Sequence, residues 1–127
     1  MDNLSVVREQ KKIIDFSQYD SLDIRMCKIL ECHDVCKNTK LEKSETNPVK
    51  AYKLLIDTGI DKRQCITNLI SFDKDSLVGL ILPFIINLPV ATIRGVESSA
   101  MILASSNANF VNLIRADPAV TPGDIVI

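Results

Sequence analysis

The sequence predicts an all-β fold, a small closed barrel with one short helix. Three observations predict it: short strand-like runs, turn signals between them, and no repeating strand–helix pattern. At 127 residues, the chain has the length of one domain. Its hydrophobic fraction is 46%, with 5% aromatic residues and no Trp. The core is therefore expected to consist of Ile, Leu and Val, as in barrels filled by branched side chains.

The clearest strand runs from Ala51 to Asp57, where apolar and polar residues alternate. This period of two puts Tyr52, Leu54 and Ile56 on one face. Tyr52 is expected in the core or an interface, although an aromatic side chain on such a barrel can also stack on a base. Further strands are predicted at residues 21–32, 64–69, 80–88, 99–104 and 110–114.

The connections between these strands carry their own signals. Irregular alternation near Cys27 and Lys28 indicates a bulge. Pro83 predicts that strand 80–88 lies at an edge or contains a bulge, because proline has no N–H for the ladder. Asp73 is a plausible N-cap for a short helix that ends near Gly79. Residues 34–50 are expected to form a long loop, and residues 1–15 an N-terminal helix or a frayed arm.

Charge and hydropathy limit the class of partner. Fifteen basic and 16 acidic residues give a net charge of −1, which argues against a dedicated high-affinity polyanion binder. Basic residues exceed acidic ones only between Lys37 and Arg63, seven against four. Residues 1–17 contain no signal-peptide core. The longest apolar stretch, 77–88, is too short to span a bilayer. We expect a cytoplasmic protein without a membrane partner.

The cysteines suggest a metal site only weakly. Cys32, His33 and Cys36 are close in sequence, but His33 is the only histidine and Cys65 the only cysteine further along. Structural zinc sites use two paired short spacings, so reduced thiols are the favoured interpretation, with no metal and no cofactor. The sequence also contains no phosphate-binding glycine loop and no nucleophile elbow. We therefore expect a protein that is not an enzyme.

Eight short motifs follow one another in an order that resembles one known family. The run from Asp23 to Ile29 is similar to the opening signature D-[IL]-R-V-G-K-I of the tRNA-binding domain family. The other motifs that resemble this family are at residues 55–59, 66–69, 75–79, 87–89, 93–98, 98–103 and 122–125. The family includes stand-alone dimeric tRNA-binding proteins, the C-terminal part of bacterial methionyl-tRNA synthetases, and the CsaA chaperones.

This resemblance covers nearly the whole chain. It implies a five-stranded OB-fold barrel over residues 16–127, with a C-terminal strand extension that pairs two subunits. A lone barrel would leave an open edge, and the apolar end of the chain, 125–127, needs cover. We therefore expect a symmetric homodimer that uses the segment from about Asn112 onward.

The resemblance also implies a set of RNA-binding residues. Arg25 and Lys28 could contact phosphates or form the solvated side of the barrel. Arg94 is in a glycine-containing loop, where ligand-binding residues are common. Without the resemblance, Met101 would be core filler and Asn87 the cap of a strand end. The RNA-binding candidates are Arg25, Lys28, Asn87, Arg94, Ser98 and Met101.

The sequence departs from the family pattern in several places. Cys27, Asn68 and Ala100 are at positions where the family often has glycine, and a lost glycine can prevent close approach of a ligand to the backbone. Pro89 takes the place of a lysine. The stretch from Ala51 to Asp57 is similar to the corresponding strand of CsaA.

Three functions follow. The first is selective binding of folded tRNA or another folded RNA through backbone contacts and a few loop side chains. The second is a CsaA-like export chaperone that binds unfolded preproteins. The third is a module that only dimerises or docks on an aminoacyl-tRNA synthetase. The near-neutral charge favours the last two, and the motifs from Ile93 to Met101 favour RNA, which we rank first.

Overall fold

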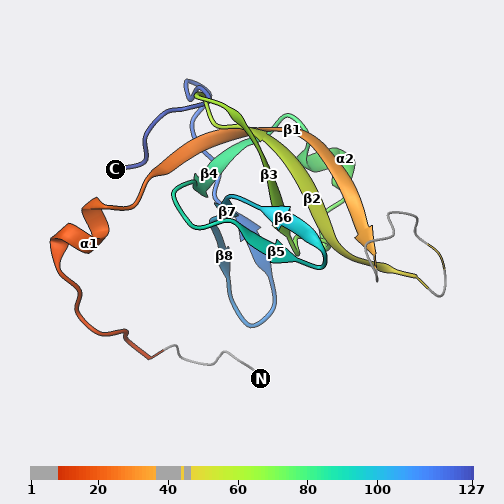
Figure 1. Ribbon diagram of the computed structural model, residues 1–127, viewed down its shortest axis with the longest axis horizontal. Helices are drawn as coiled ribbons and strands as arrows, with labels where there is room; N and C mark the ends of the chain where they lie inside the picture. Colours follow the sequence, from red (N-terminus) through yellow and green to blue (C-terminus); the bar gives the residue numbers. More distant parts are fainter. Residues whose placement is uncertain (1–8, 37–43, 45–46) are drawn as a thin grey trace.

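The computed structural model describes residues 9–36, 44 and 47–127, and it is built mostly from strands (Figure 1). In the described part of the chain, no helix is long and apolar enough to cross a membrane. The elements are α1 (Phe16–Asp20), β1 (Ile24–Cys36), β2 (Val49–Asp57), β3 (Lys62–Thr67), α2 (Lys74–Leu77), β4 (Ile81–Ile85), β5 (Ala91–Ile93), β6 (Val96–Ser98), β7 (Met101–Ile102), β8 (Ala104–Ser106) and β9 (Val111–Leu113).

Five antiparallel strands form the main sheet in the order β3-β2-β1-β4-β7. The sheet curls so that β3 meets the segment before β7, where the N–H of Ser99 donates to the carbonyl of Gln64 at 3.0 Å. The strand order, this closing contact and α2 between β3 and β4 are the features of an OB barrel. The predicted all-β fold is confirmed.

The core lies inside the barrel and follows the predicted alternation. Tyr52, Leu54 and Ile56 on β2 are buried, whereas Lys53 and Leu55 between them are partly exposed. Burying an aliphatic side chain of this size stabilises the fold by about 1.5–3 kcal/mol. The hydroxyl of Tyr52 donates to the carbonyl of Phe72 at 2.7 Å, so this aromatic ring belongs to the core.

Strand β1 is longer than the sequence indicates. Its first half pairs with β4 and its second half with β2, and it continues to Cys36 through residues 34–36, which we had predicted as loop. The burial of Val35 and Cys36 explains the extension, since strand geometry holds both side chains against neighbouring strands. The irregularity predicted near Cys27 lies slightly further on, between Ile29 and Glu31.

The prediction that Pro83 marks an edge or a bulge is wrong. Strand β4 lies between β1 and β7, and its register with β1 contains no shift. Pro83 faces Met26, whose N–H and carbonyl bond instead to Asp124 and Gly123 at 2.8 and 2.7 Å. The Met26–Pro83 pair is therefore not hydrogen-bonded, so the ladder between β1 and β4 does not need a proline N–H. On the other side, the carbonyl of Pro83 accepts from Leu103 at 2.9 Å, just beyond the residues that pair β4 with β7.

The N-terminal segment carries its helix later than predicted. Residues 9–15 have no regular structure, and α1 begins at Phe16 after Asp15, whose carboxylate and Gln18 form a capping box. Residues 1–8 of the predicted N-terminal helix or arm lie outside the described residues. Figure 1 shows residues 9–15 running away from the barrel below α1, so the described part of 1–15 has the form of an arm. Whether 1–15 and 16–127 are separate units stays a prediction.

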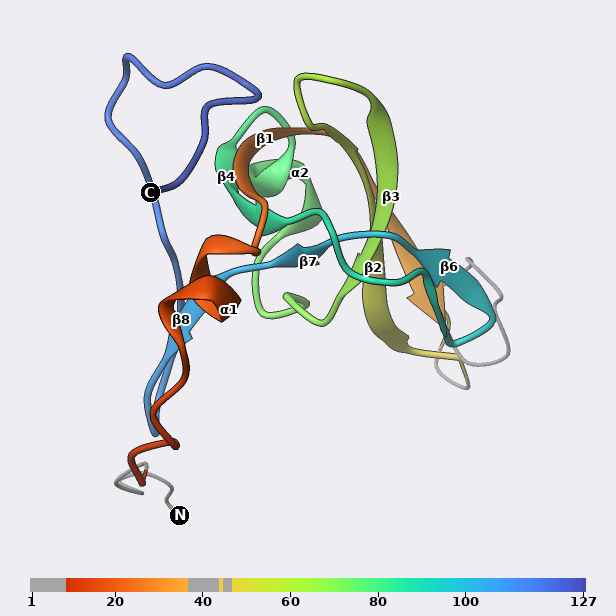
Figure 2. The same cartoon turned by 60° about the vertical axis from the view of Figure 1, so that its left-hand side comes forward.

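The C-terminal segment returns to the barrel after the β8–β9 hairpin (Figure 2). Val126 donates its N–H to the carbonyl of Ile24 at 2.8 Å, and Arg25 forms a bridge with Ile125. The segment 123–126 thus occupies the edge of β1 that β2 leaves free. Close packing at Gly59 and Gly123, both with positive φ, brings it against the β2–β3 turn.

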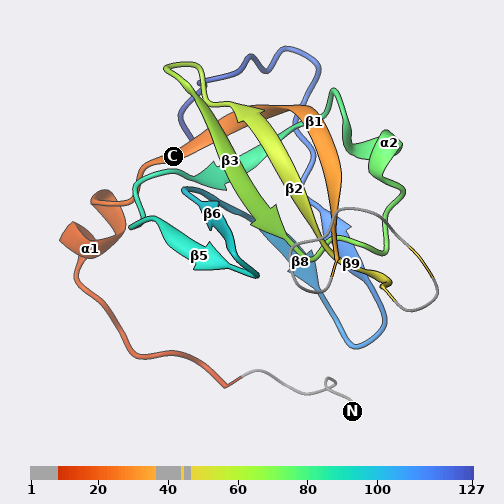
Figure 3. The same ribbon diagram turned by 45° about the vertical axis from the view of Figure 1, so that its right-hand side comes forward.

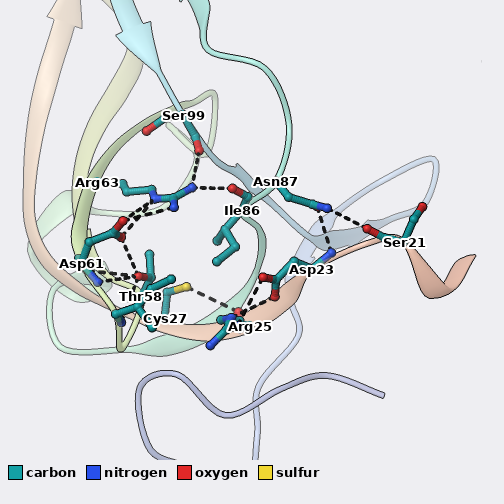
Figure 4. A network of polar contacts seen from close by, with 11 residues as sticks. Ser21, Asp23, Arg25, Cys27, Thr58, Asp61, Arg63, Ile86, Asn87 and Ser99 are labelled. Carbon is teal, nitrogen blue, oxygen red and sulfur yellow. Dashed lines mark hydrogen bonds and ion pairs between the residues drawn. The ribbon is translucent and has the colours of Figure 1, made fainter.

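One end of the barrel is held by a polar network around Arg63 (Figure 4). Its guanidinium donates to the carboxylate of Asp61 at 3.0–3.2 Å and to the backbone carbonyls of Ile86 and Ser99. The hydroxyl of Thr58 also donates to Asp61, at 2.7 Å. One side chain on β3 therefore fixes the chain after β4 and the chain before β7.

The network predicts acid sensitivity. The hydrogen bonds from Arg63, and then that from Thr58, hold the pKa of Asp61 below its usual 3.8. Because the folded-state pKa is the lower one, the stabilisation is complete above about pH 5 and decreases as the pH falls below the unfolded-state value. We expect the urea concentration at the unfolding midpoint to decrease when the pH is lowered below about 4. Asp61→Asn should flatten this dependence; an unchanged slope in that variant would contradict the assignment.

Candidate nucleic-acid interface

The most prominent surface feature is the hairpin of β5 and β6, which Figure 3 shows beside β3. Its two-residue turn consists of Arg94 (φ 52°) and Gly95 (φ 79°). Two consecutive positive φ angles are those of a type I′ turn, which matches the twist of paired strands. Glycine takes this conformation freely, but an arginine does so at a cost. Such strain is retained most often where a side chain has a function.

The hairpin is anchored on the outside of the barrel wall. Ile93 and Val96 pack against a small cluster of Val35, Ala51 and Ile66, which is separate from the main core. The side-chain amide of Gln64 donates to the carbonyl of Glu97 at 2.8 Å. These contacts hold the residues on both sides of the turn, so the exposed Arg94 projects from a fixed support.

A groove of about 570 Å³ lies between this hairpin, the end of β3 and the β7–β8 region. Such a volume lies within the range of small-ligand sites. Its apolar lining comes from Ala51, Ile66, Leu69, Ile93, Met101, Ile102, Ala104 and Val111. Its polar lining comes from Lys50, Thr67, Asn68, Arg94, Ser105 and Ser106.

Two cations border the groove, Lys50 at the start of β2 and Arg94 in the hairpin turn. Both are exposed, and neither forms an ion pair with a described residue. A lysine and an arginine that are free of carboxylates can neutralise an incoming phosphate. The arrangement is therefore suited to a polyanion that also contacts an aliphatic surface.

Of the six residues predicted to bind RNA, the structure brings Arg94 and Met101 together at this groove. Met101 is 42% exposed on β7 and contributes a flexible apolar side chain to the wall. Its outward position excludes the alternative that it is core filler.

Ser98 and Asn87 have structural roles. Ser98 is buried, and its hydroxyl accepts the N–H of Ile66 and donates to the carbonyl of Ala100. The amide of Asn87 accepts from the N–H of Asp23 and donates to the carbonyl of Ser21, at 2.9 and 2.7 Å. Asn87 thereby fixes the entry to β1, as Figure 4 shows.

Arg25 and Lys28 do not line the groove. The guanidinium of Arg25 forms an ion pair with Asp23 at 2.8 Å, and this hydrogen bond raises the pKa of Arg25. Lys28 is exposed on β1, opposite Asp57 on β2. Both residues lie on another part of the barrel, so a phosphate contact by Arg25 or Lys28 stays a prediction.

The thiols show no sign of activation. Burial raises the pKa of Cys27 to about 12, and those of Cys32 and Cys65 to about 11. His33 is exposed and hydrogen-bonds Glu31 at 2.8 Å. Among the described residues, no three His, Cys, Asp or Glu side chains lie close enough to hold a metal ion. Neutral thiols of this kind, buried at Cys27 and Cys65 and half-buried at Cys32, are poor nucleophiles.

An OB barrel with a cationic hairpin beside a groove defines a class of small binding domains. Comparison with family models then places residues 24–125 in the family described as "Putative tRNA binding domain". This chain belongs to the tRNA-binding domain family, which confirms the resemblance seen in its motifs.

The most similar curated proteins include two methionine–tRNA ligases. The ligase of Thermotoga maritima is 28% identical over 121 residues, which is 94% of this chain and 18% of that protein. The ligase of Methanococcus vannielii is 33% identical over 113 residues, 88% of this chain and 16% of that protein. The chain therefore spans about a sixth of these relatives.

Two solved structures share the fold over their whole length. A CsaA chaperone protein from Picrophilus torridus has a TM-score of 0.74 and 24% identity, with 91% of this chain and 100% of that chain covered. A MetRS-related protein from Pyrococcus horikoshii has a TM-score of 0.76 and 21% identity, with 92% and 100% covered. At these identities, the likeness concerns the fold.

Proposed function

We propose that this chain is a tRNA-binding module, without catalytic activity of its own, that holds folded RNA at the groove beside Arg94. The observation that carries the proposal is the strained turn that presents this arginine, free of carboxylate partners, at the rim of the groove. The family of the chain and its methionine–tRNA ligase relatives support tRNA as the RNA. A synthetase is the matching protein partner.

Two groove cations set the strength of the interaction. Each phosphate that a cation neutralises adds about −0.9 to the slope of log affinity against log salt, so Lys50 and Arg94 give roughly −2. The net charge of −1 adds no long-range attraction. We therefore expect weak, strongly localised binding of tRNA.

The decisive test reverses the charge at the turn. Arg94→Glu should lower the affinity for tRNA by at least about tenfold, because a charge-assisted phosphate contact becomes a repulsion. Fluorescence anisotropy with folded tRNA at low salt measures it. Lys62→Glu is the matched control, since Lys62 is exposed at the start of β3 and does not line the groove. Equal losses in both variants would show a diffuse charge effect and refute the site.

The aliphatic lining of the groove favours one alternative, the binding of unfolded protein as in a CsaA chaperone. Ile66, Ile93 and Met101 offer a surface that apolar side chains could contact. A reduced unfolded protein, added as a competitor in the same assay, separates the two functions. If it binds while tRNA fails to bind even at low salt, the chaperone function replaces the RNA function.

We further propose that the protein forms a homodimer through α1 and the C-terminal segment. Apolar side chains there are exposed: Phe16 at 73%, Ile125 at 64% and Ile127 at 100%. Phe16, Ile125 and Ile127 also line one groove, so they form a continuous surface. Exposed patches of this kind are typical of subunit interfaces.

Light scattering at micromolar concentration should give twice the 14.1 kDa mass of the chain. Ile125→Asp should shift the protein to a monomer, because it buries a charge in the proposed interface. Val90→Asp, a control with similar exposure (61% against 64%) outside that surface, should leave the mass unchanged. A wild-type protein of single-chain mass would refute the dimer.

A further inference from the structure

We infer that the groove beside Arg94 takes an unpaired stretch of RNA by its sugar–phosphate chain and recognises the ribose 2′-hydroxyl, an inference that rests on the RNA binding proposed above. It specifies which part of an RNA enters the site. The groove would then distinguish RNA from DNA without reading base sequence.

The lining of the groove argues against reading of bases. Single-stranded nucleic acids are usually held by aromatic side chains on which the bases stack. None of the described residues that line this groove is aromatic. The described aromatic side chains lie elsewhere: Tyr52 and Phe84 are in the core, Phe72 packs against it, Phe16 and Tyr19 are on α1, and Phe110 is exposed in the turn between β8 and β9. The bases of a bound strand would therefore point away from the groove, and all four would be accepted.

The polar groups of the groove suit a sugar instead. Asn68, Ser105 and Ser106 are exposed, and none of their side chains forms a hydrogen bond with another described residue. A serine hydroxyl both donates and accepts, as the 2′-hydroxyl of ribose does. These side chains come from two sides of the groove, the end of β3 and β8. A ribose between them can form hydrogen bonds that a deoxyribose cannot.

The other residues that line the groove suit the sugar carbon atoms and the phosphates of a nucleic-acid strand. Ile66, Ile93 and Met101 present aliphatic atoms to the carbon atoms of the sugars. Lys50 and Arg94 supply one cation each for the flanking phosphates. The groove is lined by residues of β5 and β8, and Figure 3 shows where these two strands lie. A double helix is too wide to enter such a groove, so the segment that enters must be unpaired.

The test compares three probes on the wild-type protein by fluorescence anisotropy at low salt. They are an oligouridylate of about ten nucleotides, the deoxyuridylate of the same length, and the oligouridylate paired with its complement. We expect the RNA strand to bind about tenfold more tightly than the DNA strand, which corresponds to one or two hydrogen bonds. The duplex should bind more weakly than the single strand.

A variant connects this preference to the groove. Ser105→Ala together with Ser106→Ala should reduce the affinity for the RNA strand to that for the DNA strand and leave DNA binding unchanged. Both serines are exposed, so the fold should be retained. Ser71→Ala, an exposed serine that does not line the groove, is the control and should keep the preference.

The possible failures are distinct. Equal affinity for the RNA and DNA strands, or for the duplex and the single strand, overturns the ribose inference even if tRNA still binds and Arg94→Glu still weakens it. Loss of the preference in Ser71→Ala also overturns it. If tRNA itself does not bind at low salt, the proposed function fails instead.

Discussion

Phe84→Ala is expected to lower the free energy of unfolding by about 3–5 kcal/mol. Phe84 is fully buried on β4, the strand that pairs with both β1 and β7. Removing its ring leaves a cavity where these strands meet, and the barrel can close this cavity only by distorting its own hydrogen-bond ladder. A small domain has only about 5–15 kcal/mol of stability, so much of the fold's stability would be lost.

Urea unfolding followed by circular dichroism measures the loss. Phe110→Ala is the matched control, because Phe110 is 67% exposed beside the β8–β9 hairpin. It should change the stability by less than about 0.5 kcal/mol, as exposed substitutions usually do. A loss of similar size in both variants would mean that Phe84 is not the centre of the core.

The regular part of the fold could be predicted because it depends on local patterns. The alternation of β2 places Leu54 and Ile56 in the core, and Asp73 does precede α2. The end of β1 could not be predicted in this way. Residues 34–36 lead into a long polar stretch and were therefore predicted as loop, but their pairing with β2 and the burial of Val35 and Cys36 make them a strand. Tertiary contacts, and not local propensity, determine where β1 ends.

The β5–β6 hairpin was also missed. Its turn is Arg94-Gly95, and the usual signal of such a turn is Asn-Gly or Asp-Gly. The strands themselves contain only three residues each. The motif that resembles the family nevertheless directed attention to Arg94, and the hairpin now supplies the physical reason for that residue.

Only some of the six predicted RNA-binding residues lie at the groove, and the hydrogen-bond partners of the others explain why. Polar residues such as Ser98 and Asn87 have the same sequence signal whether they bind a ligand or the backbone, and here both bind the backbone. Lys50 was noted only as part of a basic stretch. It joins Arg94 at one groove through the pairing of strands distant in sequence, which no local pattern reveals.

The positions of the missing family glycines have different consequences. The side chains of Cys27 and Ala100 are buried in the core and so do not obstruct a ligand. Asn68, in contrast, is exposed at the groove. Of the three departures, only this one is placed to change how closely a ligand approaches the backbone.

Gly59→Ala is expected to detach the C-terminal segment from the barrel. An added Cβ at Gly59 would lie 2.4 Å from the Cα of Gly123, and this backbone cannot move aside while the bonds between Met26 and Asp124 and between Met26 and Gly123 persist. The variant therefore combines a positive-φ penalty with the loss of the backbone hydrogen bonds that hold the C-terminal segment on β1. We expect a loss of about 2–4 kcal/mol in the free energy of unfolding.

Gly79→Ala separates these two contributions. Gly79 has φ +94°, close to the +90° of Gly59, but an added Cβ there meets no atom within 4 Å. It should therefore show only the conformational cost, about 1–2 kcal/mol. Hydrogen exchange provides the second measurement: the N–H groups of Met26 and Val126 should lose protection in Gly59→Ala and keep it in Gly79→Ala. Retained protection in both variants would show that the Gly59–Gly123 contact does not hold the C-terminal segment.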